Sequence, residues 1–233
     1  MIPKVIHYCW FGYNRKSKLI KHCISSWRKY FPDFEIKEWN ESNTDLDENE
    51  YIRLAYKAKK WAFVSDYVRV KVLYEYGGLY FDTDVEVIRK FPEDLFYKKA
   101  FAGIEGFSKM VAPGLVFGCE SGLPIFKAVL DSYKKDDFAF TSIEKMMTIN
   151  MRVTEILERD GYVKDDKYQE IDEISIFPSE IFNAYDGVNR IKQITDKTLS
   201  FHHYAGSWLP WYRRLRMRIG TTVRHIKYSL RHG

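Results

Sequence analysis

Residues 60–87, KWAFVSDYVRVKVLYEYGGLYFDTDVEV, constrain the fold of this 233-residue chain more than any other stretch. The first half carries apolar side chains at three- and four-residue spacing, which predicts a helix. Gly77 and Gly78 follow, and glycine commonly marks the end of a helix. The short apolar run 79–81 then predicts a buried strand that ends in Asp82-Thr83-Asp84.

The two carboxylates at the end of this strand are spaced to act together. Residues i and i+2 of an extended chain point to the same side, so we expect Asp82 and Asp84 to project together. Neighbouring carboxylates repel each other unless one is protonated or a cation lies between them. Hard oxygen ligands suit Mg²⁺ or Mn²⁺, which often also bind phosphate oxygens. The pair therefore favours a metal site for a phosphorylated substrate, and the plain alternative is a surface turn, where Asp is common.

The preceding helix carries polar residues near its apolar face. Asp66 and Arg69 are three residues apart, which makes them neighbours on a helix surface, and Ser65 lies beside them. An isolated pair of this kind is most simply an ion pair at the edge of a core. Buried charges need partners, however, and a polar ligand is one such partner. The combination SDxxR, GG and DxD within residues 65–84 is much more specific than any of its parts.

Residues 65–87 resemble the signature of glycosyltransferase family 32, the DXD-containing sugar transferases, which include bacterial capsule and lipopolysaccharide enzymes and yeast mannosyltransferases. The opening IPKVIHYCWFG and the late HHYAGSW also resemble this family, so the resemblance extends to about Trp208. The sequence is also similar, more distantly, to the glucosylating domains of large clostridial toxins. The resemblance implies an α/β, Rossmann-like GT-A fold over residues 1–208, with a mostly parallel central sheet and flanking helices.

The resemblance also implies a divalent cation, Mn²⁺ or Mg²⁺, held by Asp82 and Asp84. In the related toxin domains, an acidic residue five positions before a matching Trp serves the metal. His203 lies five positions before Trp208, so it is expected as the third ligand, with His202 as the alternative. An imidazole can complete such a shell.

Further roles follow from the resemblance for residues that would bind the nucleotide-sugar donor. Trp10 would stack on a uracil ring, and either Asn40 or Asn43 would contact the donor. Asp66 and Arg69 would bind the sugar hydroxyls, and Tyr80 and Asp82 would also contact the donor. Ser207 and Trp208 would lie over the diphosphate. The catalytic residues that the resemblance implies are Asp66, Arg69, Asp82 and Asp84.

The activity implied is transfer of a hexose with retention of configuration, from a UDP-sugar more than from GDP-mannose, to a growing polysaccharide or glycolipid. No residue stands out as a covalent nucleophile, so the acceptor hydroxyl is expected to attack from the face of the departing diphosphate, which takes the proton.

Two alternative functions stay open. A phosphohydrolase of the haloacid dehalogenase type also begins with Asp-x-Asp, but it wants Thr or Val where Glu86 stands. A non-catalytic sugar- or membrane-binding protein of the same fold would not need both acids.

Charge is distributed unevenly along the chain. The net charge is +5, but all eight charged residues after Asp196 are basic, so residues 1–196 hold 29 basic against 32 acidic residues, a balance of −3. The tail 209–233 combines Arg with Trp, Leu, Met and Ile, which favours an interfacial helix on anionic lipid over a solvated C-terminus. Nucleic acid is not expected as a partner, because the body is acidic and shows no reader motif.

The remaining sequence predicts an alternation of strands and helices typical of an α/β domain. Three cysteines without a CxxC pair argue against a disulfide framework and a zinc site. No secretory signal or membrane span is evident, so we expect a cytoplasmic protein, peripheral on the inner membrane face if the tail binds lipid. The other expected strands are 4–10, 34–39, 85–88, 101–104, 114–117, 174–178 and 198–203, and the other expected helices are 18–30, 49–60, 123–133 and 143–159.

Overall fold

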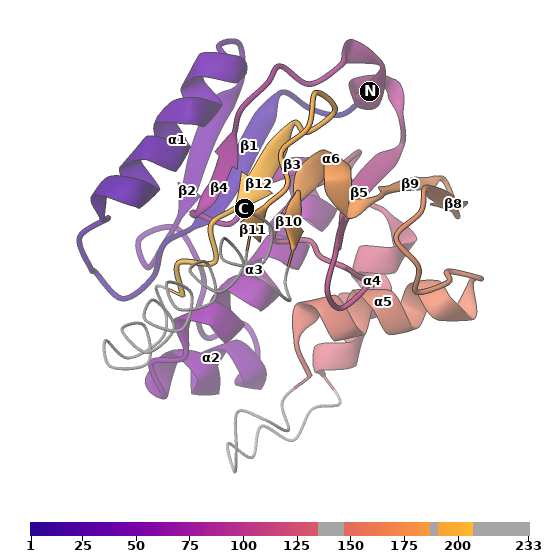
Figure 1. Ribbon diagram of the computed structural model, residues 1–233. Helices are drawn as coiled ribbons and strands as arrows, with labels where there is room; N and C mark the ends of the chain where they lie inside the picture. The colour runs from indigo at the N-terminus through magenta and orange to yellow at the C-terminus, as the bar shows by residue number, and fades with distance from the viewer. Residues whose placement is uncertain (135–146, 187–190, 207–233) are drawn as a thin grey trace.

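The computed structural model describes residues 1–134, 147–186 and 191–206, and these form helices on both faces of a central sheet (Figure 1). The sheet has eight strands, with the order β2-β1-β3-β7-β5-β9-β8 and β6 paired to β5. Its strands are β1 (Val5–Cys9), β2 (Glu35–Trp39), β3 (Gly78–Tyr80), β5 (Ala100–Glu105), β6 (Met110–Val111), β7 (Phe117–Cys119), β8 (Gln169–Ile171) and β9 (Ile174–Phe177).

The sheet is mostly parallel in direction. β1 pairs in parallel with β2 and β3, and β5 pairs in parallel with β9. β7 lies antiparallel between β3 and β5, which leaves β2, β1, β3, β5 and β9 running the same way. This confirms the α/β fold with a mostly parallel sheet that the sequence predicts.

Two short ladders lie outside this sheet. β4 (Val85–Val87) pairs antiparallel with β12 (Ser200–His202), and β10 (Tyr185–Asp186) pairs with β11 (Ile191–Lys192). The first ladder matters for function, because it brings the late histidine motif against the segment that carries Asp84.

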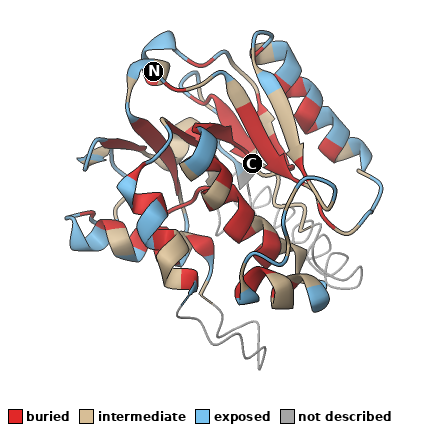
Figure 2. Ribbon diagram, turned by 180° about the vertical axis from the view of Figure 1, so that it is seen from behind, coloured by how far each residue is buried: buried red, intermediate tan, exposed pale blue. Residues whose placement is uncertain are grey.

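A separate hydrophobic core covers each face of the sheet. One core joins the sheet to α1 (Lys18–Tyr30), β4 and α6 (Ser179–Phe182). The other joins it to α2 (Glu50–Lys57), α3 (Trp61–Tyr76), α4 (Pro124–Tyr133) and α5 (Ile149–Arg159). Figure 2 shows the inner strands of the sheet buried, whereas the edge strands β2 and β8 are partly exposed. A 3-10 helix, η1 (Glu93–Tyr97), completes the described elements.

Helix α1 confirms the predicted helix 18–30. The Ser17 hydroxyl accepts from the Ile20 N–H and caps the helix, and the buried residues Ile20, Ile24 and Trp27 recur at helical spacing. The Trp27 indole donates to the Val85 carbonyl at 2.9 Å. This bond anchors the segment that follows Asp84 to the helix beneath it.

The expected helix 49–60 is shorter and does not run into the central helix. α2 ends at Lys57, and Lys59 has a φ of 55° before α3 begins at Trp61. α3 ends at Gly77, where an added Cβ would lie 2.7 Å from the Cys119 carbonyl oxygen and where φ is 65°. Only glycine fits there, so the Gly77 stop is confirmed.

Two other predicted elements need correction. The strand expected at 114–117 begins only at Phe117, because the Gly114 carbonyl accepts from the Asp82 N–H instead of joining a ladder. The helix expected at 143–159 begins at Ile149 with Thr148 as its cap, and residues 143–146 lie outside the described part. The tail 209–233 lies outside the described part as well.

None of the described helices is both long and apolar enough to span a membrane. All three cysteines are buried and free.

Candidate functional site

The carboxyl ends of β1, β2 and β3 form one edge of the sheet. In the parallel register, Cys9 lies opposite Trp39, and His7 lies opposite Tyr80. Trp10, Asn40 and Asp82 therefore follow three neighbouring strand ends, although they are far apart in the sequence. Open α/β sheets bind ligands beyond such carboxyl ends.

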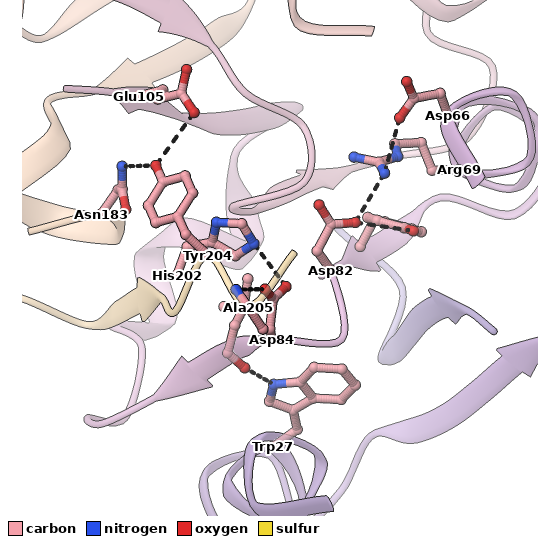
Figure 3. A network of polar contacts seen from close by, with 12 residues as sticks. Trp27, Asp66, Arg69, Asp82, Asp84, Glu105, Asn183, His202, Tyr204 and Ala205 are labelled. Atoms are coloured by element: carbon pink, nitrogen blue, oxygen red, sulfur yellow. Dashed lines mark hydrogen bonds and ion pairs between the residues drawn. The ribbon is translucent and has the colours of Figure 1, made fainter. Parts of the chain in front are cut away.

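Arg69 of α3 joins two carboxylates at this edge (Figure 3). Its Nη2 lies 3.1 Å from Asp66 Oδ1 and 2.9 Å from Asp82 Oδ1. The guanidinium also lies over the Tyr80 ring, at 4.8 Å from its centroid. The structure thus brings together the four residues Asp66, Arg69, Tyr80 and Asp82.

Burial dominates the titration of the two carboxylates that Arg69 joins. It raises the pKa of Asp66 to about 6, although the charge of Arg69 acts in the opposite direction. It also raises the pKa of Asp82, again against Arg69. Without the guanidinium, both negative charges would be hard to keep in this environment. Arg69 is therefore the group that allows Asp66 and Asp82 to share one site.

His202 contacts Asp84, the second acid of the DxD motif. Its Nε2 lies 2.7 Å from Asp84 Oδ1, and the Ala205 N–H donates to Oδ2 at 2.8 Å. Burial would raise the pKa of Asp84, but the charge and hydrogen bond of His202, with the Ala205 N–H, lower it to about 2. Burial would lower the pKa of His202, but Asp84 raises it above its usual value. Asp84 is therefore ionised at neutral pH.

The structure places His203, the expected third ligand, away from the DxD carboxylates. Its Nε2 lies 2.8 Å from Glu86 Oε2, and His22 lies 3.1 Å from the other Glu86 oxygen. The cause is strand geometry, because β12 pairs with β4 so that His202 lies opposite Val85. Consecutive side chains then point to opposite sides, and His202 is the one that reaches Asp84.

Gly114 is a site residue that sequence reasoning did not single out. Its carbonyl accepts from the Asp82 N–H at 2.8 Å. A Cβ at this position would lie 2.1 Å from Asp82 Oδ2 and 2.7 Å from Arg69 Nη1. Only a residue without a side chain fits against this pair. The signal in the sequence is the pair Pro113-Gly114, at the start of the expected strand 114–117.

A hollow of about 750 Å³ adjoins the ends of β1 and β2. The Trp10 indole donates to the Asn14 carbonyl at 2.7 Å, and Lys16 lies 5.3 Å from its ring. Asn40 lines the hollow, whereas the Asn43 amide holds the loop by donating to the Glu38 carbonyl at 2.8 Å. The lining residues are Trp10, Tyr13, Asn14, Arg15, Lys16, Lys21, Glu38, Asn40, Glu41 and Ser42.

The donor set beside the DxD motif suits a hard divalent cation. Asp82, Asp84 and His202 offer carboxylate oxygens and an imidazole. Asp82 Oδ2 has no hydrogen-bond partner among the described residues, so it is available to a ligand. Across residues 1–134, 147–186 and 191–206, no three acidic, His or Cys side chains already converge as a closed metal centre. Ser207 and Trp208 lie outside the described residues.

The fold is similar to that of solved transferase structures. A crystal structure of a glycosyltransferase involved in the glycosylation of the major capsid of PBCV-1 matches with a TM-score of 0.52 and 13% identity, over 91% of this chain and 97% of that one. A galactosyltransferase, LgtC, in complex with donor and acceptor sugar analogues, matches with a TM-score of 0.48 and 15% identity, over 90% of each chain. The described architecture is thus the GT-A fold.

A family description matches part of the sequence. Residues 17–102 match the family described as "Glycosyltransferase sugar-binding region containing DXD motif". This match confirms the resemblance to DXD-containing glycosyltransferases over these residues. Subversion of eukaryotic traffic protein A from Legionella pneumophila (strain Philadelphia 1) is 22% identical over 175 residues, which cover 60% of this chain and 27% of the relative. The chain therefore spans about a quarter of that protein.

Proposed function

We propose that the protein is a metal-dependent, retaining glycosyltransferase that transfers a hexose from a UDP-sugar to a growing cell-surface polysaccharide or glycolipid. One observation carries the proposal. The Arg69-joined pair Asp66 and Asp82 lies beside the Asp84–His202 pair at the carboxyl edge of parallel strands. This edge also adjoins the hollow at Trp10.

The hollow at Trp10 is proposed to receive the nucleoside. Its lining combines an aromatic ring with the amide of Asn40 and the cations Arg15, Lys16 and Lys21. An aromatic face suits a base, while positive charge suits the phosphates that follow it. Asn40 replaces Asn43 as the proposed polar contact, because Asn40 is among the residues that line the hollow and Asn43 is not.

Asp82 and Asp84 are proposed to hold Mn²⁺ or Mg²⁺, with His202 in place of His203 as the nitrogen ligand. A cation bound there would offset the negative charge that develops on the departing diphosphate. The choice of His202 is supported by its Nδ1, which is buried without a hydrogen-bond partner in the described part of the chain while Nε2 contacts Asp84. Glu86 instead holds His203. Ser207 and Trp208 remain proposed contacts to the diphosphate.

Asp66, Arg69 and Tyr80 are proposed to orient the sugar. Arg69 is fixed between two carboxylates, and the Tyr80 hydroxyl lies 3.5 Å from Asp82 Oδ1. Groups held this rigidly can bind hydroxyls without losing further freedom. Retention then follows if the acceptor hydroxyl attacks from the face that the diphosphate leaves and gives its proton to that diphosphate.

The cellular setting is proposed from the chemistry of the acceptor. Polysaccharides and glycolipids are assembled at the inner membrane face, which suits a cytoplasmic enzyme peripheral to that membrane. The basic residues of the tail 209–233 would be attracted to anionic lipid there. Binding of the protein to anionic and neutral vesicles, with and without this tail, tests the proposal.

The test of the activity is hydrolysis of a panel of UDP-, GDP- and dTDP-sugars with Mn²⁺, with and without chelator. We expect one nucleoside diphosphate to be released by the wild type and not by Asp84→Ala or with chelator. Asp131→Ala is the matched control, because Asp131 forms only exposed pairs with Lys127 and Lys134. Release of inorganic phosphate would favour the phosphohydrolase, and donor binding without turnover on any acceptor would favour the non-catalytic protein.

A further inference from the structure

Aromatic and polar side chains gather on the side of Asp84 that faces away from Arg69 (Figure 3). Tyr204 lies at their centre, with its ring centroid 5.0 Å from Tyr185 and 6.1 Å from Phe107. The ring of His202 lies 4.3 Å from Tyr204 and links this group to Asp84. We call the group the Tyr204 flank, and it consists of Glu105, Phe107, Asn183, Tyr185 and Tyr204.

The Tyr204 side chain is held in one orientation. The buried Asn183 donates its amide to the Tyr204 hydroxyl at 2.8 Å, and that hydroxyl donates to Glu105 Oε1 at 3.3 Å. Tyr204 also has a φ of 51°, a left-handed conformation that is costly for an aromatic residue. Such conformations persist where surrounding contacts fix them, and they cluster at ligand sites.

Glu105 gives the flank a carboxylate whose nearest basic group is His202; burial raises the pKa of Glu105, and the charge of His202 acts in the opposite direction. Glu105 Oε2 accepts from the Ser108 hydroxyl at 2.6 Å, and no Lys or Arg in the described part of the chain pairs with it. Asp84 lies close by, beyond His202. Two carboxylates on this side disfavour a phosphate or another anion. The flank therefore suits a neutral ligand that donates hydrogen bonds.

Phe107 supplies an exposed apolar surface next to these acceptors. Its side chain is 55% exposed, so the ring is accessible to a ligand, and its centroid lies 6.1 Å from that of Tyr204. A pyranose ring has an apolar C–H face that packs on aromatic rings and hydroxyls that donate to carboxylates. Exposed rings beside a few fixed polar groups are what such a ligand needs.

We propose that the Tyr204 flank is the acceptor subsite and that it binds the terminal, uncharged pyranose of a glycan, with a hydroxyl of that sugar donating to Glu105 and its apolar face packed on Phe107. This inference rests on the proposed glycosyltransferase function. It assigns the donor sugar to the Arg69 side and the acceptor to the opposite side, with Asp84 and His202 between them.

The test is saturation-transfer NMR on the full-length protein with UDP and Mn²⁺ present. The probes are methyl glycosides of glucose, galactose, mannose and N-acetylglucosamine. We expect at least one glycoside to bind and its affinity to fall about tenfold in Phe107→Ala and in Glu105→Gln, the size of effect that one lost ring contact or one weakened hydrogen bond causes. Tyr97→Ala is the matched control, because Tyr97 is also an exposed aromatic residue, at 68%, and lies outside the flank.

The outcomes separate this inference from the function on which it rests. Calorimetry with UDP on the same samples reports the donor site alone, and absence of UDP binding to the wild type counts against the proposed function. Glycoside binding that is the same in Phe107→Ala, Glu105→Gln and the wild type would overturn the acceptor subsite. Binding of no glycoside, together with Phe107-dependent binding of a lysine-containing peptide, would overturn it in favour of a protein acceptor.

Discussion

The imidazole of His202 lies 2.7 Å from the carboxylate of Asp84, whereas the neighbouring His203 is held by Glu86. Two adjacent histidines thus contact two different acids, because β12 pairs with β4 in a fixed register. Their effects on activity should differ accordingly.

We predict that His202→Gln lowers Mn²⁺-dependent donor hydrolysis by about 100-fold, because loss of a ligand or of its partner weakens metal binding strongly. His203→Gln is the matched variant and should lower it by less than about tenfold. Initial rates across a Mn²⁺ titration measure both. A larger loss in His203→Gln than in His202→Gln would return the ligand role to His203.

Arg69 should be essential for stability as well as for activity. Arg69→Met leaves the buried Asp66 and the half-buried Asp82 without their shared cation, and breaking a buried ion pair in this way costs about 3–5 kcal/mol. Arg69→Lys keeps the positive charge but reproduces only part of the guanidinium's contacts with Asp66 and Asp82. It should therefore lose less stability than Arg69→Met. Denaturant unfolding measures both variants.

The control for Arg69 is Arg53→Met, because Arg53 pairs with Glu50 at the surface. Exposed pairs contribute about 0–1 kcal/mol. If Arg69→Met and Arg53→Met unfold at the same denaturant concentration, the buried arrangement of Asp66, Arg69 and Asp82 is contradicted.

Gly114→Ala should inactivate the protein while leaving most of its fold intact. The new Cβ would displace Asp82 and Arg69, which it would approach at 2.1 and 2.7 Å. Gly122→Ala is the control, because no atom lies within 4 Å of its Cβ position and only its φ of 77° is strained. We expect Gly122→Ala to lose about 1 kcal/mol of stability and keep donor hydrolysis. Full activity in Gly114→Ala would contradict the close contact.

His7 should make the protein less stable in acid. Its Nε2 donates to the Gly77 carbonyl and its Nδ1 accepts from Trp39, so the ring is neutral. Burial lowers its pKa from 6.5 to about 4, partly opposed by the Gly77 hydrogen bond. The unfolded chain therefore binds a proton between these pH values while the folded chain does not. The free energy of unfolding should fall by up to about 3 kcal/mol as the pH falls through this window.

Denaturant unfolding from pH 7 to pH 4 measures this loss, and NMR titration reports the His7 ring directly. His7→Gln removes the titrating group, so the contribution of His7 to the pH dependence of the free energy of unfolding should be lost. Identical pH profiles for the wild type and His7→Gln would show that the ring is protonated in the folded state too.

The central part of the fold was predictable because local signals agree there. Helix α1 has a capping serine, an apolar stripe and a proline beyond its end, and its bounds match the prediction. The double glycine after α3 marks a stop that the packing also demands. Asp66, Arg69 and Asp82 meet because a helix face and the next strand end are joined by a tight turn.

What could not be predicted depends on contacts between distant segments. The choice between His202 and His203 depends on the β12–β4 register, and a shift of one residue would exchange them. The break at Lys59 has no glycine or proline to announce it. Glu105 and Tyr204 meet through tertiary packing alone, and no local pattern links them.

The most direct test of the account is calorimetric titration of UDP into the protein with Mn²⁺ and with chelator. We predict that UDP binds to the wild type only when Mn²⁺ is present, and that Asp84→Asn loses this binding. The variant should be less stable than the wild type, because its ion pair with His202 is lost, but it should stay folded at the temperature of the titration. UDP binding of equal strength with chelator, or full Mn²⁺-dependent binding in Asp84→Asn, would contradict the proposed donor site.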